Sequence, residues 1–229
     1  MKNVAAALTL GLMALPAFGQ AQALPSLTYY GRASVKIKTA SGLVIYIDPY
    51  QGDYSEPADL VLVTHGHSDH NAVDKVAMKK DCAVVAPKGA ASGKFAPRPI
   101  AEGQELEVAG IKVSAVAAYN KNHARSSSVG YVLAFDGLTL YHSGDTNKLP
   151  EMAALASRKI DWALFCTDGF YNMGAAEAAE CAALVVAKRS IPIHSSPNGL
   201  HDPKTAEAYA KAAPGGLVVP VGGVVALKP

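Results

Sequence analysis

Short apolar segments separated by turn residues recur through the first two thirds of the chain and predict β-strands. Segment 60–64 is a continuous apolar run, which is typical of a strand buried on both faces. The turn pair Asp136-Gly137 joins two such segments and predicts a hairpin, whereas helical spacing of apolar residues predicts a helix over 71–80. The expected strands are 27–30, 34–39, 43–47, 60–64, 83–86, 111–117, 129–135 and 138–142.

The last third of the chain alternates between strand-like and helix-like segments. Its Ala- and Glu-rich stretch favours a helix, and Pro203 stands near the start of a second one, where its missing N–H is tolerated. Strands mixed with helices, without an internal repeat or a low-complexity linker, predict one domain of layered α/β structure. The expected elements are strands over 161–165 and 191–193, helices over 175–188 and 203–213, and apolar segments at 217–220 and 224–227.

The composition is that of a globular protein. Of 229 residues, 50% are hydrophobic and 17% are charged, a balance that argues against disorder. The length is sufficient for one domain with a full core. The formal net charge is +2, and the chain has no basic run or basic patch rich in aromatic residues. Nucleic acid is therefore not expected as a partner.

The N-terminus has the layout of a secretory signal peptide. Lys2 precedes an apolar run over 4–18, and small residues follow up to Ala21-Gln22-Ala23, which fits an A-x-A cleavage site. The alternative is a membrane anchor, but the run is shorter than the ~20 residues that span a bilayer. We therefore expect removal of residues 1–23 and an exported domain over 24–229, periplasmic or secreted, with no stable membrane anchor.

Three cysteines remain in the mature chain, Cys82, Cys166 and Cys181, and none belongs to a C-x-x-C pair. An odd number in an exported chain leaves at least one thiol free or in an intermolecular bridge. We favour burial of these cysteines as small hydrophobic side chains. One disulfide of unspecified pairing is the alternative.

The main chemical signal is the segment Thr64-His65-Gly66-His67-Ser68-Asp69-His70, which follows a buried strand directly. In an extended segment, the alternate residues His65 and His67 can point at one position, and Asp69 and His70 can serve a second position nearby. Imidazole and carboxylate ligands suit zinc, manganese or iron. The pattern H-x-H-x-D-H would occur by chance in only ~3 in 10,000 shuffled chains, so it predicts a metal site.

This segment resembles the H-x-H-x-D-H signature of the metallo-β-lactamase superfamily. His123, Asp145 and His194 follow in the order of that family's pattern, the last two at the ends of expected strands. The stretch Tyr-His-Ser-Gly-Asp-Thr at 141–146 is similar to the UlaG-like branch, which includes an ascorbate-6-phosphate lactonase. The resemblance covers nearly the whole mature chain and implies an αββα sandwich.

By this resemblance, the cofactors are two divalent metal ions, zinc in the first place, with manganese or iron as alternatives. Asp69 is also the expected catalytic residue, since it can orient the attacking water or accept its proton. The implied activity is hydrolysis of an ester, lactone or phosphoester bond in a small-molecule substrate. The implied ligands are His65, His67 and His123 for one ion, Asp69, His70 and His194 for the other, and Asp145 as a bridge.

Three other functions stay open. An oxygen-reducing di-iron protein is disfavoured because such relatives place Glu where this chain has His67. A β-lactamase is disfavoured because such relatives generally lack the bridging Asp145, although export suits an antibiotic substrate. A metal-binding protein without catalysis is the third alternative, and the complete set of seven ligand positions argues against it. No G-x-S-x-G motif competes with the metal site.

Several residues are candidates for supporting roles. Asp48 ends an expected strand next to the motif, where it is either an orienting partner of a ligand histidine or a turn residue. We expect His142 to pack behind the site and His201 to be a loop or helix-start residue. Lys121 and Arg125 flank the third predicted histidine and could bind an anionic substrate, although solvated loop charges are commoner.

The resemblance also has departures. Many members of the branch carry His where this chain has Arg32, and Pro and Gly where it has Cys166 and Asp168. We expect these residues to border the site and to set it apart from relatives. Phe170 and Tyr171 are candidates to line the pocket or to pack in a loop before a helix.

Overall fold

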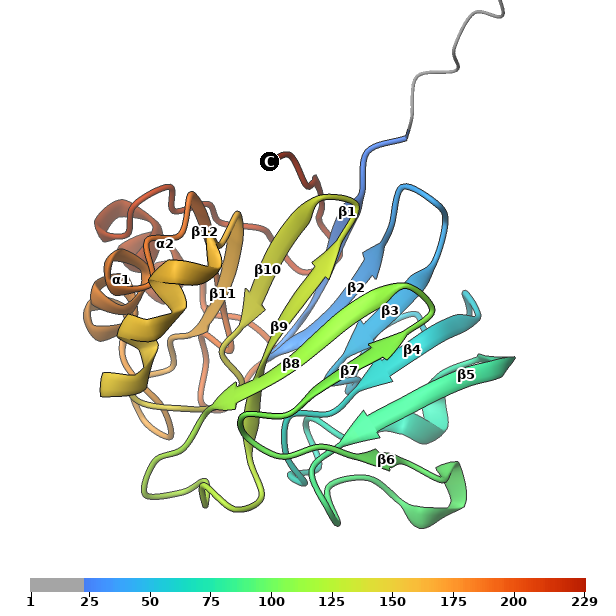
Figure 1. The fold of residues 1–229 in the computed structure, drawn as a ribbon. Coiled ribbons are helices and arrows are strands. Elements are labelled where there is room, and N and C mark those ends of the chain that lie inside the picture. The colour runs from blue at the N-terminus through green and yellow to red at the C-terminus, as the bar shows by residue number, and fades with distance from the viewer. Residues whose placement is uncertain (1–22) are drawn as a thin grey trace, which may run out of the picture.

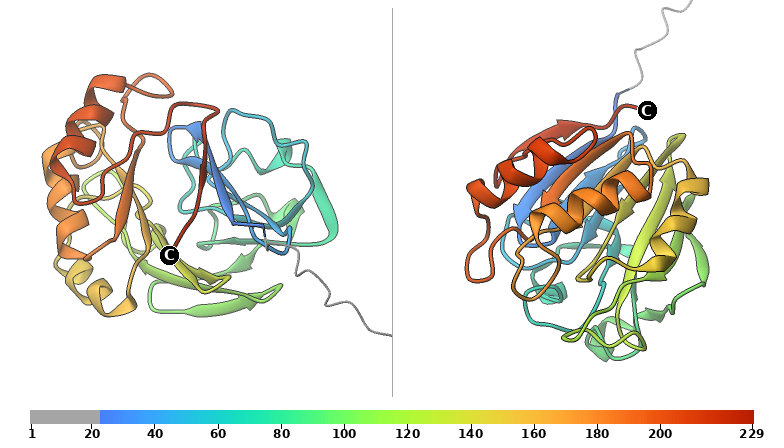
Figure 2. Two further views of the ribbon diagram at one scale, coloured as in Figure 1. Left: turned by 90° about the horizontal axis from the view of Figure 1, so that it is seen from above. Right: turned by 90° about the vertical axis from the view of Figure 1, so that its left-hand side faces the viewer.

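The computed structural model describes residues 23–229, and the predicted signal peptide (1–23) lies outside this range except for its last residue. Two β-sheets face one another, and α-helices cover the outer face of one of them (Figures 1 and 2). This arrangement confirms the predicted layered α/β fold. Within the described residues, no helix combines the length and the hydropathy needed to cross a membrane.

The first sheet has seven strands in the order β13-β1-β2-β3-β4-β5-β6. The strands from β3 to β6 run parallel to one another, whereas β13, β1, β2 and β3 pair antiparallel. The last strand of the chain therefore closes the sheet beside the first. The bounds are β1 (Ser26–Gly31), β2 (Ser34–Lys38), β3 (Val44–Ile47), β4 (Ala58–Leu62), β5 (Met78–Ala86), β6 (Arg98–Pro99) and β13 (Val224–Ala226).

The second sheet has six strands in the order β12-β11-β10-β9-β8-β7. Strands β7 to β10 form an antiparallel meander, and β10, β11 and β12 run parallel. The predicted hairpin turn lies at Asp136 and Gly137, which have φ values of 49° and 74°, as the twist of a two-residue hairpin requires. The bounds are β7 (Glu105–Val108), β8 (Ile111–Ala117), β9 (Val129–Phe135), β10 (Leu138–His142), β11 (Trp162–Cys166) and β12 (Arg189–Ile193).

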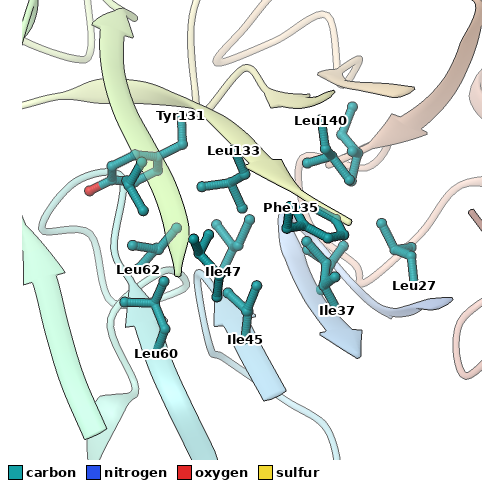
Figure 3. Close-up of a cluster of buried hydrophobic side chains, with 14 of the residues drawn as sticks. Leu27, Ile37, Ile45, Ile47, Leu60, Leu62, Tyr131, Leu133, Phe135 and Leu140 are labelled. Carbon is teal, nitrogen blue, oxygen red and sulfur yellow. The ribbon is translucent and has the colours of Figure 1, made fainter. Parts of the chain in front are cut away.

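The main core lies between the two sheets, where side chains from both interdigitate (Figure 3). In β3, Ile45 and Ile47 point into this core, while Val44 and Tyr46 are buried on the opposite face of the sheet. Alternate strand residues point to opposite faces, so a strand covered on both faces reads as a continuous apolar run.

The two outer faces are covered differently. The helices α1 (Ala175–Leu184) and α2 (Pro203–Ala212) and the 3-10 helix η3 (Pro150–Arg158) pack on the second sheet. The outer face of the first sheet is covered by irregular chain and by the single turn η1 (Val73–Lys75). The sandwich implied by the resemblance is present, but its second helical layer is reduced to short turns.

The helix predicted over 71–80 is wrong. Only η1 is helical there, and β5 begins at Met78, which pairs with Ala58 of β4. The apolar residues Val73 and Val76 are three apart and buried under the first sheet, a spacing that one 3-10 turn satisfies. Of the two apolar segments expected at the end of the chain, 224–227 contains β13, whereas 217–220 forms no strand. Four elements were not predicted: β6, β7, the short turn η2 (Gly93–Phe95) and η3.

Helix α1 ends four residues earlier than predicted, at Leu184. The N–H of Val186 donates to the carbonyl of Ala183, and the N–H of Ala187 donates to that of Ala182. This pair of bonds is a Schellman motif, whose left-handed position is usually glycine. Here Val186 occupies it, with a φ of 55° and an exposed side chain. A β-branched residue is strained in this conformation.

Replacing Val186 with Gly should raise the free energy of unfolding by about 1 kcal/mol, because relief of left-handed strain exceeds the added chain entropy of glycine. Denaturant unfolding of both proteins measures the difference. Val221→Gly is the matched control, since Val221 is also exposed and is not at positive φ, so this change should destabilise. Equal or lower stability of Val186→Gly would count against the strain.

Candidate metal centre

Ligand-type side chains gather at one edge of the sandwich, beyond the carboxyl ends of strands from both sheets. Residues 65–70 follow β4, Asp145 follows β10, and His194 follows β12 directly. His123 lies in the loop between β8 and β9. Since parallel strands end at a common edge, residues that are far apart in the sequence meet there.

All seven residues predicted as metal ligands come together in the structure. They form three groups whose ligand atoms lie within 4.8 Å of one another and could hold a metal ion. The first and second groups share His65, and the second and third share His70, so the three make one continuous cluster. The groups are His65, His67 and His123; His65, His70 and Asp145; and Asp69, His70 and His194.

Asp145 lies at the centre of the cluster. Its Oδ2 atom is 3.5 Å from the Nε2 atoms of His70, His123 and His194. The preceding residue, Gly144, has a φ of 61° and forms the turn that positions this carboxylate. A Cβ added at Gly144 would lie 2.7 Å from the carbonyl oxygen of Val129. The turn before Asp145 therefore requires glycine.

The carboxylate of Asp48 holds His70 from behind. Its Oδ2 lies 2.8 Å from Nδ1 of His70 and also accepts a hydrogen bond from the Thr64 hydroxyl at 2.6 Å, while its Oδ1 accepts one from the Thr64 N–H at 2.7 Å. This contact leaves Nε2 of His70 directed at the cluster. Of the two roles considered for Asp48, the structure shows the contact with a predicted ligand histidine that the orienting role requires.

Two other buried histidines have a neutral partner at Nδ1. The Nδ1 atom of His65 lies 3.0 Å from Oγ1 of Thr64, and that of His123 lies 2.8 Å from Oδ1 of Asn120. Such partners fix the tautomer and the ring orientation of a ligand histidine. Sequence reasoning missed Thr64 and Asn120, and the only available signal was their short distance from a ligand along the chain.

Asp168 borders the site, as expected, and organises the loop that follows β11. Its Oδ2 lies 3.3 Å from Nδ1 of His194, a contact that falls short of hydrogen-bond geometry. Its Oδ1 accepts hydrogen bonds from the N–H groups of Phe170, Tyr171 and Asn172. One carboxylate thus links His194 to the loop that carries two exposed aromatic side chains.

The electrostatics of the cluster favour a cation. Burial opposes the charge of His70, but the carboxylates of Asp145 and Asp48 outweigh it and raise its pKa well above the usual range. Burial and the neighbouring His70 lower the pKa of His65 to about 2, so this ring is neutral at pH 7. Despite burial, the histidines around Asp145 hold its pKa well below the usual range.

Three atoms of cluster residues are buried and have no hydrogen-bond partner within the described residues: Nε2 of His70, Oδ1 of Asp145 and Nδ1 of His194. Of these, Nε2 of His70 lies 3.5 Å from Oδ2 of Asp145, whereas Nδ1 of His194 faces Asp168. Buried polar atoms without partners are uncommon, and imidazole nitrogen and carboxylate oxygen atoms are ligands that suit a divalent metal. The donor set therefore fits the metal that the sequence predicts.

The supporting candidates divide clearly. Nε2 of His142 contacts the carbonyl of Ala33, and Nδ1 of this ring accepts from the N–H of Gly144, so it packs behind the site as expected. His201 lies before α2, with Nδ1 3.1 Å from Oγ of Ser195, also as expected. The guanidinium of Arg125 is bound by glutamates, so the proposed role in anion binding is not supported.

The cysteines are free within residues 23–229: Cys166 and Cys181 are buried and Cys82 is partly buried. This agrees with the favoured reading of small hydrophobic side chains. Burial raises the pKa of the Cys166 thiol well above its usual range and raises that of Cys181 to about 12. Neither thiol is a thiolate nucleophile at neutral pH.

A pocket of about 310 Å³ opens over the cluster. Asp69, His123, Asp145 and His194 form part of its wall, and Tyr171 contributes from the loop after β11. Asp69 is the only aspartate of the cluster with substantial exposure, 25% against 4% for Asp145. Asp69 is therefore the carboxylate of the cluster that is most accessible to a molecule in this pocket.

The family model described as "Beta-lactamase superfamily domain" matches residues 26–194, a range that contains all seven clustered residues. The chain belongs to the metallo-β-lactamase superfamily of hydrolases. The match confirms the fold and the enzyme class that the histidine pattern predicted.

Relatives and solved structures agree with this membership. A protein of Myxococcus xanthus named "UPF0173 metal-dependent hydrolase" is 34% identical over 195 residues. The match covers 73% of the present chain and 69% of the relative. A protein of Lysinibacillus sphaericus with the same name is 31% identical over 192 residues, covering 73% and 84%. The structure of a candidate metal-dependent hydrolase from Parabacteroides distasonis is 28% identical, with a TM-score of 0.73 and coverage of 85% and 92%.

Replacing Asp48 with Asn should lower zinc affinity by about 10- to 100-fold, the usual effect of losing an outer partner of a ligand histidine. The introduced side-chain amide would put an NH2 group where the Asp48 oxygens now face donors of Thr64 and His70, so at least one hydrogen bond would be lost. Competition with a chelator of known affinity measures the change. The control is Asp53→Asn, since Asp53 is exposed and accepts only from Ser55. Unchanged affinity in a folded Asp48→Asn protein would contradict the orienting role.

Proposed function

We propose that this protein is an exported hydrolase with a dinuclear metal centre, acting on an ester, lactone or phosphoester bond. The observation that carries the proposal is the position of Asp145, whose Oδ2 is equally far, 3.5 Å, from histidines of two ligand groups. A carboxylate between two groups of ligands is suited to bridge two ions. Export rests on the N-terminal sequence alone.

The ligand sets follow the grouping in space. His65, His67 and His123 would hold one ion, and Asp69, His70 and His194 would hold the other. Two divalent ions, when bound, activate water at neutral pH and polarise the oxygen of the scissile bond. Zinc is the first choice for this nitrogen-rich set, with manganese or iron as alternatives.

The chain's own contribution centres on Asp69. Its carboxylate lies 3.5 Å from Nε2 of His194 and faces the pocket. Despite partial burial, the neighbouring His194 and His70 hold the pKa of Asp69 below its usual range. The ionised carboxylate therefore accepts a hydrogen bond from water in the pocket and orients it toward the substrate.

Two nearby residues, Ser143 and Cys166, do not compete for this role as nucleophiles. Ser143 is buried and its hydroxyl donates to the carbonyl of Gly144. The thiol of Cys166 is buried and protonated at neutral pH. Neither group is available as a nucleophile, which is consistent with direct hydrolysis by water rather than a covalent intermediate on either residue.

The activity test is a panel of substrates offered to the zinc-loaded mature protein: a lactone, a carboxylic ester, a phosphomonoester, a phosphodiester and a chromogenic β-lactam. We expect turnover of at least one of the first four, lost with chelator and restored by metal. Asp69→Ala should lower kcat by roughly 100-fold or more, the contribution typical of a positioned acid–base group. The exposed Asp74→Ala is the control and should keep full activity.

No turnover of any substrate, with metal bound, would favour a binding protein without catalysis. Turnover of the β-lactam alone would favour the antibiotic alternative. Turnover that survives both chelator and Asp69→Ala would place the activity outside this centre.

The dinuclear centre has a separate test in metal content. The zinc-loaded protein should contain two ions per chain by elemental analysis, and Asp145→Ala should contain fewer, because the carboxylate shared by both sets is lost. Asp74→Ala should retain both ions. One ion in the unsubstituted protein under saturating zinc would refute the dinuclear assignment without touching the hydrolase assignment.

A further inference from the structure

Arg32 lies in the wall of the pocket above the metal centre. Among the described residues that line this pocket, it is the only side chain with a permanent positive charge. The side chain is 12% exposed, and its Nε atom is 3.8 Å from Oδ2 of Asp69. An arginine so close to the reacting groups, and so far buried, calls for a partner of opposite charge.

The backbone fixes Arg32 at this place. Its N–H donates to the carbonyl of Leu200, and its own carbonyl accepts from the N–H of His194 and from the hydroxyl of Tyr29. The residue has a φ of 51°, a conformation in which glycine would be unstrained. The turn itself does not require an arginine, so the local backbone does not account for this side chain.

The guanidinium is held by one of its two edges. Nη1 donates to the carbonyls of Ser196 and Pro197 at 3.0 and 3.2 Å. Nε is buried and has no hydrogen-bond partner within residues 23–229, and Nη2 has none there either. Nε and Nη2 together form the side-on fork with which arginine binds a carboxylate or a phosphate through two parallel hydrogen bonds.

Asp69 does not satisfy this fork. A separation of 3.8 Å from Nε is too long for a hydrogen bond. Asp69 Oδ2 is nearer to Nε2 of His194, at 3.5 Å, and belongs to a group that could hold a metal ion. Once its charge serves a metal, Arg32 keeps a buried positive charge without an anion.

We infer that Arg32 binds an oxyanion of the substrate, a carboxylate or a phosphate, that lies next to the scissile bond. This inference rests on the proposed function and adds the substrate class: the preferred substrates are anionic. It also moves the anion site away from Arg125, whose guanidinium is occupied by Glu102 and Glu151. Arg32 contacts the substrate and sets its specificity, while Asp69 and the metal centre carry out the chemistry.

The binding test uses equilibrium dialysis of the zinc-loaded protein against radiolabelled inorganic phosphate and, separately, radiolabelled succinate. We expect Arg32→Gln to weaken binding of at least one probe by roughly 10- to 100-fold, as expected for loss of charge-assisted hydrogen bonds. The two probes distinguish a phosphate site from a carboxylate site. The control is Arg125→Gln, which removes the same charge from a guanidinium that is already paired.

The kinetic test uses 4-nitrophenyl acetate and the mono-4-nitrophenyl ester of glutaric acid, which differ in one negative charge. Arg32→Gln should raise KM for the anionic ester by about 10-fold or more and lower the preference for the anionic over the neutral ester, measured as the ratio of their kcat/KM values, by a similar factor. Arg32→Lys, which keeps the charge but loses the side-on fork, should fall between the two proteins.

Metal content and circular dichroism of each variant decide how a loss is read. Equal anion affinity in Arg32→Gln and the unsubstituted protein, at equal zinc content, overturns the inference. If Arg32→Gln loses zinc, Arg32→Lys decides: weakened anion binding at full zinc content supports the inference, and unchanged binding overturns it. Arg32-dependent anion binding without hydrolysis of any ester would leave this site standing and remove the proposed function.

Discussion

The buried carboxylate of Asp48 joins the ends of two neighbouring strands to an imidazole of the metal cluster. It accepts two hydrogen bonds from Thr64 and contacts Nδ1 of His70, all without exposure to solvent. A carboxylate in such a place is tolerated only because its partners compensate for lost hydration. These contacts hold the segment after β4 at His70, whose Nε2 lies 3.5 Å from Oδ2 of Asp145, the residue that follows β10 of the second sheet.

The second sheet meets this segment through a different kind of support. The loop after β11 is tied to two histidines at once: Asp168 contacts His194, and Asn120, which holds Nδ1 of His123, donates through Nδ2 to the carbonyl of Tyr171. The ligand histidines from the second sheet are therefore braced against one shared loop. That loop also forms part of the pocket wall through Tyr171. A substrate that contacts the loop can therefore influence the positions of His123 and His194.

Much of the site could be read from the sequence because its signal is local. Four of the predicted ligands lie within one short motif, residues 65–70. The strand before this motif is buried on both faces, and such a strand is recognisable in the sequence as a continuous apolar run. The structure brings them together with His123, Asp145 and His194. Their roles as ligands of two ions stay predictions until metal is measured.

The failures were long-range or backbone effects. For Arg125, anion binding was the less common of two alternatives, and its pairing with Glu102, 23 residues away along the chain, could not be read from the sequence. The end of α1 was predicted too late along the chain. The pattern of side chains does not reveal that Val186 adopts a left-handed conformation, which ends the helix. Over residues 71–80, the spacing of apolar residues matched that of a helix. In the structure, Met78 pairs with Ala58, so the end of this segment belongs to the sheet.

The proton on His70 has a consequence for metal uptake. Asp145 and Asp48 raise the pKa of this imidazole well above its usual range, so a proton on His70 would offset the charge of the two carboxylates before a metal binds. Uptake is then an exchange in which the proton leaves, so apparent affinity rises with pH until His70 is neutral. Calorimetric titrations in buffers of different ionisation enthalpy would count that proton.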